Sequence, residues 1–419
     1  MNEELDGAWM RHLESVRWFG GKGAGAHIVR RDALPAHTAE GAWPRVRSEI
    51  ATLAYPDGHQ EYYHLLVAHR PSDVPAGAVV LGTSTDADGA PVQVIDATTD
   101  AEALTAFVAA TMPAFAGRPV GVWSGEQSNT TLTLGEGDLY KVFRRIEPGP
   151  NLETEVLMAL AGGPVPQVRG RLVGDWPAGT GTDLGIVMER IPGAVDGWEL
   201  ATAACRAGED FSPRAQALGE ALRRTHTRLA EAFGVREASG DAIAELMSAR
   251  LDAAVAAAPG LAEHAAPLRA AFDGVRGRTL AVQRVHGDFH LGQTLDSPAG
   301  WTLIDFEGEP AKTAAERRAF DSPWRDVAGM VRSFDYARSA HDDPASAEAI
   351  GWADLSREAF VAGYCGPHTP DDVLRAYMID KAVYEVVYEV RNRPDWVSIP
   401  MRAIHEAAGT PTSSHTDKE

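Results

Sequence analysis

The sequence is poor in cysteine. Only two of its 419 residues are cysteines, Cys205 and Cys365. They lie far apart, and neither has a second Cys or a His at the spacing of a metal-ligand set. Because disulfides are typical of secreted proteins, we expect reduced thiols in a cytoplasmic protein, with a disulfide as the less favoured alternative.

Positive charge is also scarce. The chain has 39 Lys and Arg residues against 59 Asp and Glu residues, a formal net charge of −20 at pH 7. Affinity for nucleic-acid backbones or for anionic membrane surfaces comes from clustered Lys and Arg, so this charge excludes a general role of either kind. We expect a small molecule as the partner of a monomer or a homodimer.

Long apolar runs are absent. The longest Ala-rich run, 251–272, is interrupted by Pro259, Gly260 and Pro267, whereas a membrane span needs about 20 predominantly apolar residues. The first residues, Met-Asn-Glu-Glu-Leu-Asp, are acidic and include neither the basic nor the apolar part of a secretory signal. We therefore expect a soluble, cytoplasmic protein.

What remains is the composition of a folded protein of more than one domain, with 44% apolar and 23% charged residues. Residues 1–113 contain alternating segments around turns such as Pro56-Asp57-Gly58, which predicts an N-terminal α+β cap. Residues 114–191 have the pattern of a small antiparallel sheet with one inserted helix. Residues 192–419 are mostly helical. The predicted fold class is α+β, with two lobes and a cap.

The densest chemistry lies between residues 286 and 307. Asp288 follows His-Gly, Gln293 comes five residues later, and an apolar strand-like segment ends in Asp305 and Glu307. An Asp beside a substrate hydroxyl can orient it or accept its proton, and a second Asp can hold Mg²⁺ against nucleotide phosphates. Hard cations prefer carboxylate and amide oxygens, so Gln293 and Glu307 are candidate metal ligands beside Asp305. Each residue alone also fits a turn or a cap, and only the spaced combination is informative.

This string resembles the Brenner-type motif of the aminoglycoside phosphotransferase-like kinases, which phosphorylate small molecules and have a protein-kinase-like fold. That family has His-Gly-Asp, an Asn five residues after the Asp, and a later Asp in an Ile-Asp-(Phe/Trp) strand. Gln293 stands here where most members have Asn. The longer strings His-Gly-Asp-Phe-His-Leu-Gly-Gln and Ile-Asp-Phe-Glu-Gly-Glu-Pro are similar to those of the actinobacterial maltokinases and glucosamine kinases. The resemblance implies a sugar kinase that uses ATP and Mg²⁺, with Asp288 as its catalytic residue.

Lys141 and a downstream Glu fit the nucleotide side of such a kinase. Lys141 lies in a strand-like segment, and Glu155 follows in a helix pattern. A strand Lys can neutralise nucleotide phosphates while a helix Glu holds it in place. We favour Glu155 over Glu153 as the partner, because residues two apart on a helix face different directions. A surface Lys beside a solvated helix would be the ordinary interpretation without the catalytic string.

Further nucleotide contacts are implied only by position in the resemblance. The turn Ser124-Gly125-Glu126-Gln127-Ser128 joins two strand candidates, and Ser128 is placed near the phosphates, although an ordinary hairpin has the same composition. Glu189 and Ile191 lie where the family has a linker whose backbone meets adenine.

The acceptor site is expected in the helical part of the chain. Carboxylates and aromatic rings bind sugars, and both recur at helical spacing between residues 380 and 391. A helix burying Val and Tyr behind a solvated Lys and Glu face explains most of these positions equally well. The substrate-binding candidates are His290, Asp335, Tyr384, Glu385 and Trp396. We also expect Arg325 and Asp326 to brace the catalytic loop as an internal ion pair.

Two acceptors fit the resemblance. Maltose would be phosphorylated at its anomeric hydroxyl and glucosamine at its primary hydroxyl. Glucosamine carries an ammonium, so its pocket should offer a carboxylate without a partner, for which Asp335, Glu385 and Glu389 are candidates. We favour glucosamine because the cap is compact, with maltokinase as the alternative. A nucleotide-binding pseudokinase or regulator is a further alternative, although Lys141, Asp288 and Asp305 are all present.

Overall fold

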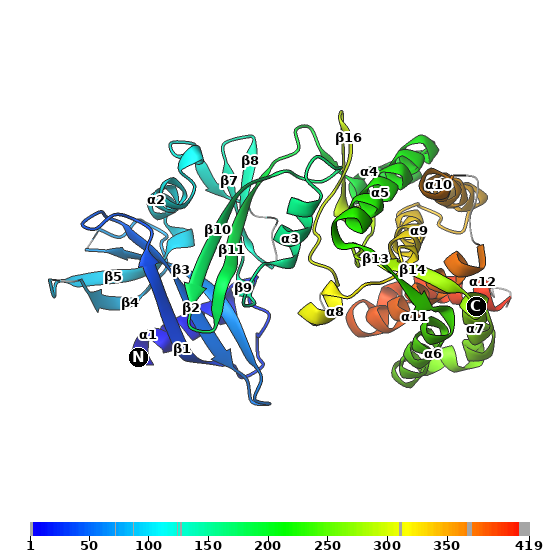
Figure 1. The fold of residues 1–419 in the computed structure, drawn as a ribbon, viewed down its shortest axis with the longest axis horizontal. Coiled ribbons are helices and arrows are strands. Elements are labelled where there is room, and N and C mark those ends of the chain that lie inside the picture. The colour runs from blue at the N-terminus through cyan, green and yellow to red at the C-terminus, as the bar shows by residue number, and fades with distance from the viewer. Residues whose placement is uncertain are drawn as a thin grey trace, which may run out of the picture. The chain divides into compact units, whose positions relative to one another are not determined.

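The structure is a computed structural model, and it describes residues 3–71, 73–86, 88–123, 125, 128–309, 312–366 and 371–409. The chain forms two compact units (Figure 1). The first comprises Met1–Met158 and Pro166–Pro192, and the second comprises Ala159–Val165 and Gly193–Glu419. Among the described residues, no helix combines the length and the apolar character needed to cross a membrane. The division into a cap, a nucleotide-binding lobe and a helical lobe at residues 113 and 191 stays a prediction.

The first unit begins with an antiparallel sheet, here called the cap sheet. Its strand order is β1-β2-β3-β5-β4, and the short strand β9 also pairs with β3. The strands are β1 (His27–Ala36), β2 (Arg45–Ala54), β3 (Gln60–Arg70), β4 (Val80–Thr85), β5 (Pro91–Asp96) and β9 (Arg145–Ile146). The turn at Pro56-Asp57-Gly58 joins β2 to β3, with Ala54 opposite Gln60, so the predicted hairpin is confirmed.

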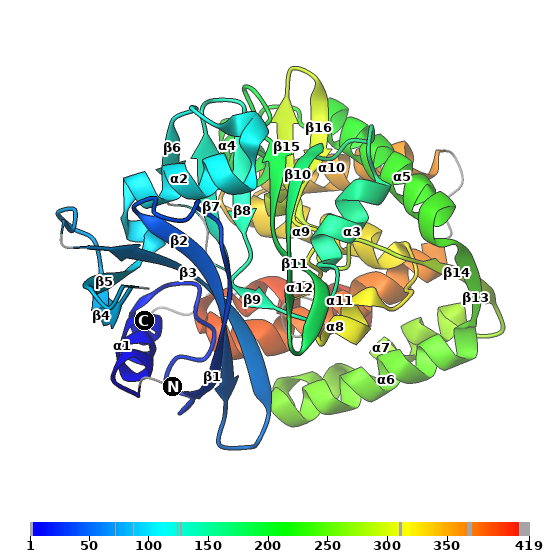
Figure 2. The same cartoon turned by 60° about the vertical axis from the view of Figure 1, so that its left-hand side comes forward.

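Two helices complete the cap region. Helix α1 (Glu3–Ser15) buries Leu5, Trp9 and Leu13 against apolar residues of the cap sheet (Figure 2). Helix α2 (Ala101–Thr111) begins at Asp100, whose side chain accepts hydrogen bonds from two backbone N–H groups of the first turn. Such a cap satisfies donors that have no partner within the helix.

A second antiparallel sheet completes the first unit and carries Lys141. Its order is β10-β11-β8-β7-β6. The strands are β6 (Val120–Val122), β7 (Thr130–Leu134), β8 (Asp138–Val142), β10 (Val168–Trp176) and β11 (Gly179–Glu189), with helix α3 (Leu152–Ala159) between β9 and β10. Lys141 on β8 lies opposite Thr131 on one side and Ile186 on the other. The strand-strand-helix-strand pattern of the sequence therefore predicted this sheet correctly.

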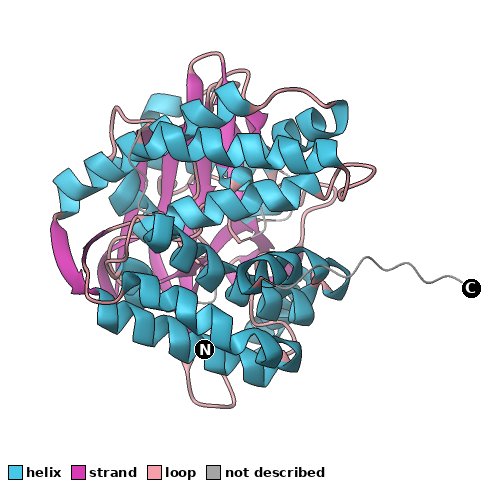
Figure 3. Ribbon diagram, turned by 90° about the vertical axis from the view of Figure 1, so that its right-hand side faces the viewer, coloured by secondary structure: helices cyan, strands magenta, loops and turns pink. Residues whose placement is uncertain are grey.

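The second unit is mostly helical (Figure 3). Its longer helices are α4 (Gly197–Ala207), α5 (Ser212–Phe233), α6 (Gly240–Ala257), α9 (Trp324–Arg338), α10 (Ala347–Cys365), α11 (Asp371–Asn392) and α12 (Ser398–Ala408). Helices α5 and α10 approach closely at two glycines. A Cβ added at Gly219 would collide with the carbonyl oxygen of Phe360, and one added at Gly363 would collide with that of Gln216. This approach brings side chains of α5 and α10 within hydrogen-bonding distance.

Short strands of the second unit position residues 286–307, here called the catalytic string. Strand β14 (Thr279–Gln283) pairs with β13 (Val235–Ser239) and leads into His286-Gly287-Asp288. The one-turn 3-10 helix Leu291–Gln293 follows, and then β15 (Thr294–Ser297) forms a hairpin with β16 (Gly300–Leu303). Asp305 comes two residues after β16, so both predicted carboxylates lie in loops at the ends of β-structure.

Candidate active site

Hydrogen bonds to the backbone hold the catalytic string in place. Asp326, in the first turn of α9, accepts hydrogen bonds from the N–H groups of His286 (2.7 Å) and Gly287 (2.9 Å). The His286 ring contacts the carbonyl oxygen of Ile304 through Nε2 at 2.9 Å. Gly287 has a φ of +87°, which a residue with a Cβ rarely adopts. These contacts fix the backbone immediately before Asp288 and tie it to the segment that carries Asp305.

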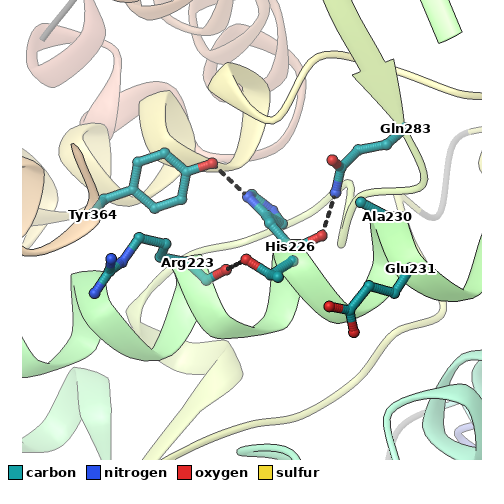
Figure 4. A pocket seen from close by; sticks show the side chains of 7 residues that line it. Arg223, His226, Ala230, Glu231, Gln283 and Tyr364 are labelled. Atoms are coloured by element: carbon teal, nitrogen blue, oxygen red, sulfur yellow. Dashed lines mark hydrogen bonds between the residues drawn. The ribbon is translucent and has the colours of Figure 1, made fainter. Parts of the chain in front are cut away.

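Asp326 is in turn held by a histidine. His226 Nε2 lies 2.9 Å from Asp326 Oδ2, and His226 Nδ1 lies 2.8 Å from the hydroxyl of Tyr364 (Figure 4). An ionised carboxylate only accepts, so Nε2 carries the hydrogen and Nδ1 accepts from the tyrosine. Burial alone would raise the pKa of Asp326, but the hydrogen bonds from His226 and Gly287 outweigh it and hold that pKa below its usual range.

The series of hydrogen bonds from Asp326 through His226 to Tyr364 ends at a surface cavity of about 470 Å³. Figure 4 shows His226 and Tyr364 among the residues that line this cavity. Tyr364 and His226 line it together with Arg223, Thr227, Ala230, Glu231 and Gln283. The side chain of Gln283 donates to the carbonyl oxygen of His226 at 2.7 Å, which fixes this turn of α5 against β14. The cavity therefore lies at the outer end of the hydrogen-bonded chain.

The expected ion pair between Arg325 and Asp326 is wrong, because the two side chains have separate partners. Arg325 contacts Glu309 at 2.8 Å and Asp321 at 3.2 Å, and its Nε donates to the carbonyl oxygen of Gly287 at 3.3 Å. Neighbours on a helix point in different directions, so each residue contacts the loop by itself. The expected bracing of the catalytic loop is present, through Asp326 on the N–H groups and Arg325 on a carbonyl.

Two of the three predicted metal ligands meet. Gln293 Nε2 donates to Asp305 Oδ2 at 3.0 Å, and the backbone N–H of Ile304 donates to the carbonyl of Gln293 at the same distance. Rotation of the amide would exchange its nitrogen for its oxygen, so the contact can present two oxygens to one cation. That donor set fits Mg²⁺. Glu307 lies two residues further along, and its carbonyl oxygen accepts from Arg317 at 3.0 Å.

The metal site would be built from oxygens of few residues. Within the part of the chain that the structure describes, no group of three or more His, Cys, Asp and Glu side chains could hold a metal ion. Magnesium in kinases keeps several waters and nucleotide oxygens as ligands, so it does not need such a cage. Asp305 has a φ of +63°, the one positive φ of a non-glycine residue within the described ranges.

In the first unit, Lys141 pairs with Glu153. Lys141 Nζ lies 2.8 Å from Glu153 Oε2, and both side chains are almost fully buried. The expectation that Glu153 faces away from Lys141 is therefore wrong, while a contact of Lys141 with Glu155 stays a prediction. Helix α3 begins at Leu152, so Glu153 lies in its first turn. The pairing of a strand Lys with a helix Glu is present, through Glu153.

The remaining candidates for nucleotide binding are Ser128, Glu189 and Ile191, and each has few described contacts. Ser128 Oγ accepts a hydrogen bond from the side chain of Asn129 at 3.1 Å. Ser124, Glu126 and Gln127 of the same turn lie outside the described residues. Glu189 ends β11 and pairs with Arg169 at 3.1 Å, while Ile191 follows in the loop and is half-buried.

The candidate acceptor carboxylates all have partners, which corrects the expectation of a free one. Asp335 contacts Arg332 at 2.5 Å and Arg357 at 2.6 Å. Glu385 contacts Arg332 at 2.9 Å. Glu389 accepts a hydrogen bond from the hydroxyl of Tyr336 at 3.0 Å and forms an ion pair with Arg393 at 2.7 Å. A buried carboxylate without a cation would be costly, and the helices supply arginines that offset this cost.

The other acceptor candidates differ in exposure. His290 is buried enough that desolvation lowers its pKa, against the opposing charge of Asp288, and its Nδ1 accepts from the backbone N–H of Gly292. Tyr384 is 36% exposed and its ring stacks near that of Tyr388. Trp396 is 37% exposed and stacks on Tyr336. Both residues are thus partly exposed, with Lys381 over the Tyr384 ring and Arg393 over the Trp396 ring.

Comparison with known proteins identifies relatives of the chain. No family model matches it. The glucosamine kinase of Streptacidiphilus jiangxiensis is 29% identical over 316 residues, which are 66% of this chain and 70% of the relative. The glucosamine kinase of Mycolicibacterium smegmatis is 26% identical over 318 residues, which are 68% and 78% of the two chains. The chain is thus similar to glucosamine kinases over about two thirds of its length.

Solved structures show the fold. A glucosamine kinase in complex with glucosamine, ADP and inorganic phosphate matches with a TM-score of 0.65 and 22% identity over 95% of this chain and 98% of that one. A second glucosamine kinase structure, crystal form B, matches with a TM-score of 0.65 and 23% identity over 95% and 99%. The predicted kinase-like α+β fold is thereby confirmed.

Two charged residues near the predicted site were not among the candidate residues. Lys381 Nζ lies 3.9 Å from Asp288 Oδ1, and Glu309 is buried between Arg325 and Lys312. Lys381 lies on the helical stripe next to the acidic candidates, so its spacing could have indicated it. Glu309 follows Asp305 by four residues in the same acidic string, and nothing in its local pattern distinguished it from Glu307.

Proposed function

We propose that this protein is an ATP- and Mg²⁺-dependent sugar kinase that phosphorylates glucosamine. The observation that carries the proposal is the bracing of the catalytic string: Asp326 holds the backbone before Asp288, while Gln293 and Asp305 meet at the end of the same loop. The homology to glucosamine kinases supports glucosamine as the acceptor. Phosphoryl transfer depends on positioning and charge neutralisation, which is what such a loop provides.

Each residue has a defined task in the proposed reaction. Asp288 orients the sugar hydroxyl and accepts its proton as the oxygen attacks the γ-phosphorus. The bond from that phosphorus to the bridging oxygen breaks, and its electron pair leaves with ADP. Asp305, Gln293 and Glu307 would hold Mg²⁺, which neutralises charge on the phosphates. Lys141, held by Glu153, meets the phosphates from the second sheet.

The position of transfer on glucosamine is part of the proposal. We assign the transfer to its primary hydroxyl, which gives glucosamine 6-phosphate. Since Asp335, Glu385 and Glu389 are paired with arginines or tyrosine, a free carboxylate is no longer an argument for the amine. The partly exposed side chains of Tyr384 and Trp396 are the aromatic candidates for contact with the sugar ring.

A coupled assay of ADP release tests the function directly. Purified protein with ATP and Mg²⁺ is offered glucosamine, maltose, glucose and N-acetylglucosamine, and the product is identified by mass and by phosphorus NMR. We expect turnover on glucosamine with a phosphate at the primary hydroxyl. Turnover on maltose alone would make the protein a maltokinase, and ATP binding without turnover on any sugar would support a pseudokinase.

A further inference from the structure

Lys381 lies beside the proposed catalytic Asp288. It belongs to α11, and its Nζ is 3.9 Å from Asp288 Oδ1 and 4.9 Å from the centre of the Tyr384 ring. The Lys381 side chain is 22% exposed and that of Asp288 is 25% exposed. A distance of 3.9 Å is too long for a hydrogen bond. The two side chains are therefore close without a direct hydrogen bond, and both are partly exposed.

The ammonium of Lys381 has donors to offer. Among the described residues it makes the long ion pair with Asp288 and the contact with the Tyr384 ring, and no hydrogen bond within 3.5 Å. An ammonium has three N–H donors. Partly exposed ion pairs of this length contribute little to stability, so holding the fold together does not explain the position of Lys381.

The charge of Lys381 acts on several neighbours. Burial raises the pKa of Glu385, and Arg332 and then Lys381 oppose that rise. Burial and then Lys381 lower the pKa of His290, against the opposing charge of Asp288. Glu309, whose pKa is held below its usual range despite burial, has Arg325 as its main cation and Lys381 as the next. Lys381 thus lies near Asp288 and His290 and acts as a secondary cation for two buried carboxylates, Glu309 and Glu385, whose main cations are arginines.

We propose that Lys381 is a catalytic residue that donates a hydrogen bond to an oxygen of the phosphoryl group during its transfer. This inference rests on the proposed kinase function. In the transition state charge spreads over the three equatorial oxygens of the transferred group, and a fixed ammonium lowers the energy of that charge. With the acceptor hydroxyl on Asp288, the Lys381 ammonium, 3.9 Å from Asp288 Oδ1, would be close to the attacking oxygen. The same placement explains why its donors are not used within the protein.

The test compares Lys381→Met, Lys381→Arg and a control, Arg391→Met, which changes an exposed residue near the end of the same helix. We measure kcat and KM with glucosamine, the Kd for ATP by calorimetry, and the melting temperature of each variant. We expect kcat of Lys381→Met to fall about 100-fold, the scale for loss of one transition-state donor. The KM for glucosamine, the Kd for ATP and the melting temperature should stay close to wild type. Lys381→Arg should recover part of kcat, and Arg391→Met should match wild type.

Two outcomes would overturn the inference. One is a kcat of Lys381→Met within about threefold of wild type. The other is a loss in which both Lys381 variants fall equally and ATP binding and melting temperature fall with them, because that pattern is structural. If the wild type phosphorylates no sugar, the proposed acceptor is wrong. The comparison is then made on ATP hydrolysis without sugar, where a slower Lys381→Met supports the role of Lys381 and an unchanged one removes it.

Discussion

His226 and Asp326 are joined by a hydrogen bond of 2.9 Å between Nε2 of the imidazole and Oδ2 of the carboxylate. Both residues are buried, and the same carboxylate holds the backbone N–H groups of His286 and Gly287. Asp326 thus receives three hydrogen bonds, which is most of what two carboxylate oxygens can accept. The position of the catalytic string consequently depends on a helix, α5, that contributes no residue to the proposed reaction.

Replacement of His226 should distinguish the effect of its hydrogen bond to Asp326 from the effect of the space that its ring fills. His226→Leu removes the donor to Asp326, and we expect a loss of about 1–3 kcal/mol in the free energy of unfolding together with a lower kcat. His226→Gln can place an amide N–H where Nε2 lies and should retain most of both. Urea unfolding and turnover are measured for each variant. Equal damage in the two variants would show that the ring acts by filling space.

Three histidines in or next to the cap sheet, of which His64 and His69 are buried and His37 is half-buried, predict acid sensitivity of this region. Burial lowers the pKa of His64 to about 3, and it lowers those of His37 and His69 to about 4 each. Unfolded histidines titrate near 6.5, so below that pH the unfolded chain binds more protons than the folded one. The stabilisation is complete above pH 6.5 and decreases as the pH falls toward 4.

The expected slope is up to about 1.4 kcal/mol per pH unit for each histidine. Thermal unfolding between pH 7.5 and 4.5, followed by tryptophan fluorescence, measures it. His64→Gln should be less stable at pH 7.5 and show a shallower decline with acid, since one proton-linked group is gone. A decline as steep as that of wild type would remove His64 from this role.

The two acidic residues at the start of α3 should differ in their effect on nucleotide binding. Glu153→Gln removes the charge that holds Lys141 and should lower kcat/KM for ATP by about 10- to 100-fold, a loss of about 1.4–2.7 kcal/mol in transition-state stabilisation. Glu155→Gln, on the same helix, should lower it much less. Steady-state kinetics at varied ATP distinguish them. A larger effect at Glu155 would restore the pairing that the sequence favoured.

Asp288→Asn tests the proposed proton acceptor. The amide keeps the size of the side chain but has no basic oxygen, so kcat should fall by about 10²–10⁴-fold, the range for general-base catalysis. The Kd for ATP, measured by calorimetry in the presence of Mg²⁺, should stay near wild type. A variant that retains a near wild-type rate would exclude Asp288 from this role.

Asp305→Asn tests the metal site at constant backbone geometry. Asn adopts a positive φ at least as readily as Asp, so the substitution removes charge without adding strain at the observed φ of +63°. We expect turnover to require at least tenfold more Mg²⁺, and chelation by EDTA to abolish turnover of the wild type. A magnesium titration of activity compares the two proteins. Identical titrations would place the metal elsewhere.

Local patterns predicted most of the fold and the contact between Gln293 and Asp305. Both residues lie in one loop and hairpin, where spacing along the chain determines distance in space. The contact of Lys141 with Glu153 was not predicted, because it depends on where α3 begins and on how that helix lies against β8. Tertiary packing sets both, and spacing within the helix cannot.

The partners of the candidate acceptor carboxylates could not be predicted from spacing along the chain either. Glu385 is paired with Arg332, which lies 53 residues away on another helix. Helix periodicity indicates which residues share a face of α11, but it contains no information on which helix packs there. Asp326 is a similar case, because its partner His226 is 100 residues away.

The interleaving of the two units has a consequence for synthesis on the ribosome. Residues 159–165 belong to the second unit although they precede β10 and β11 of the first. They include Leu160 and Val165, both buried. Backbone carbonyls of this segment find partners much later in the sequence, since Arg228 donates to that of Ala161 and the N–H of Leu303 donates to that of Pro164. The nascent chain must therefore carry this apolar segment without its final partners while more than a hundred further residues are translated.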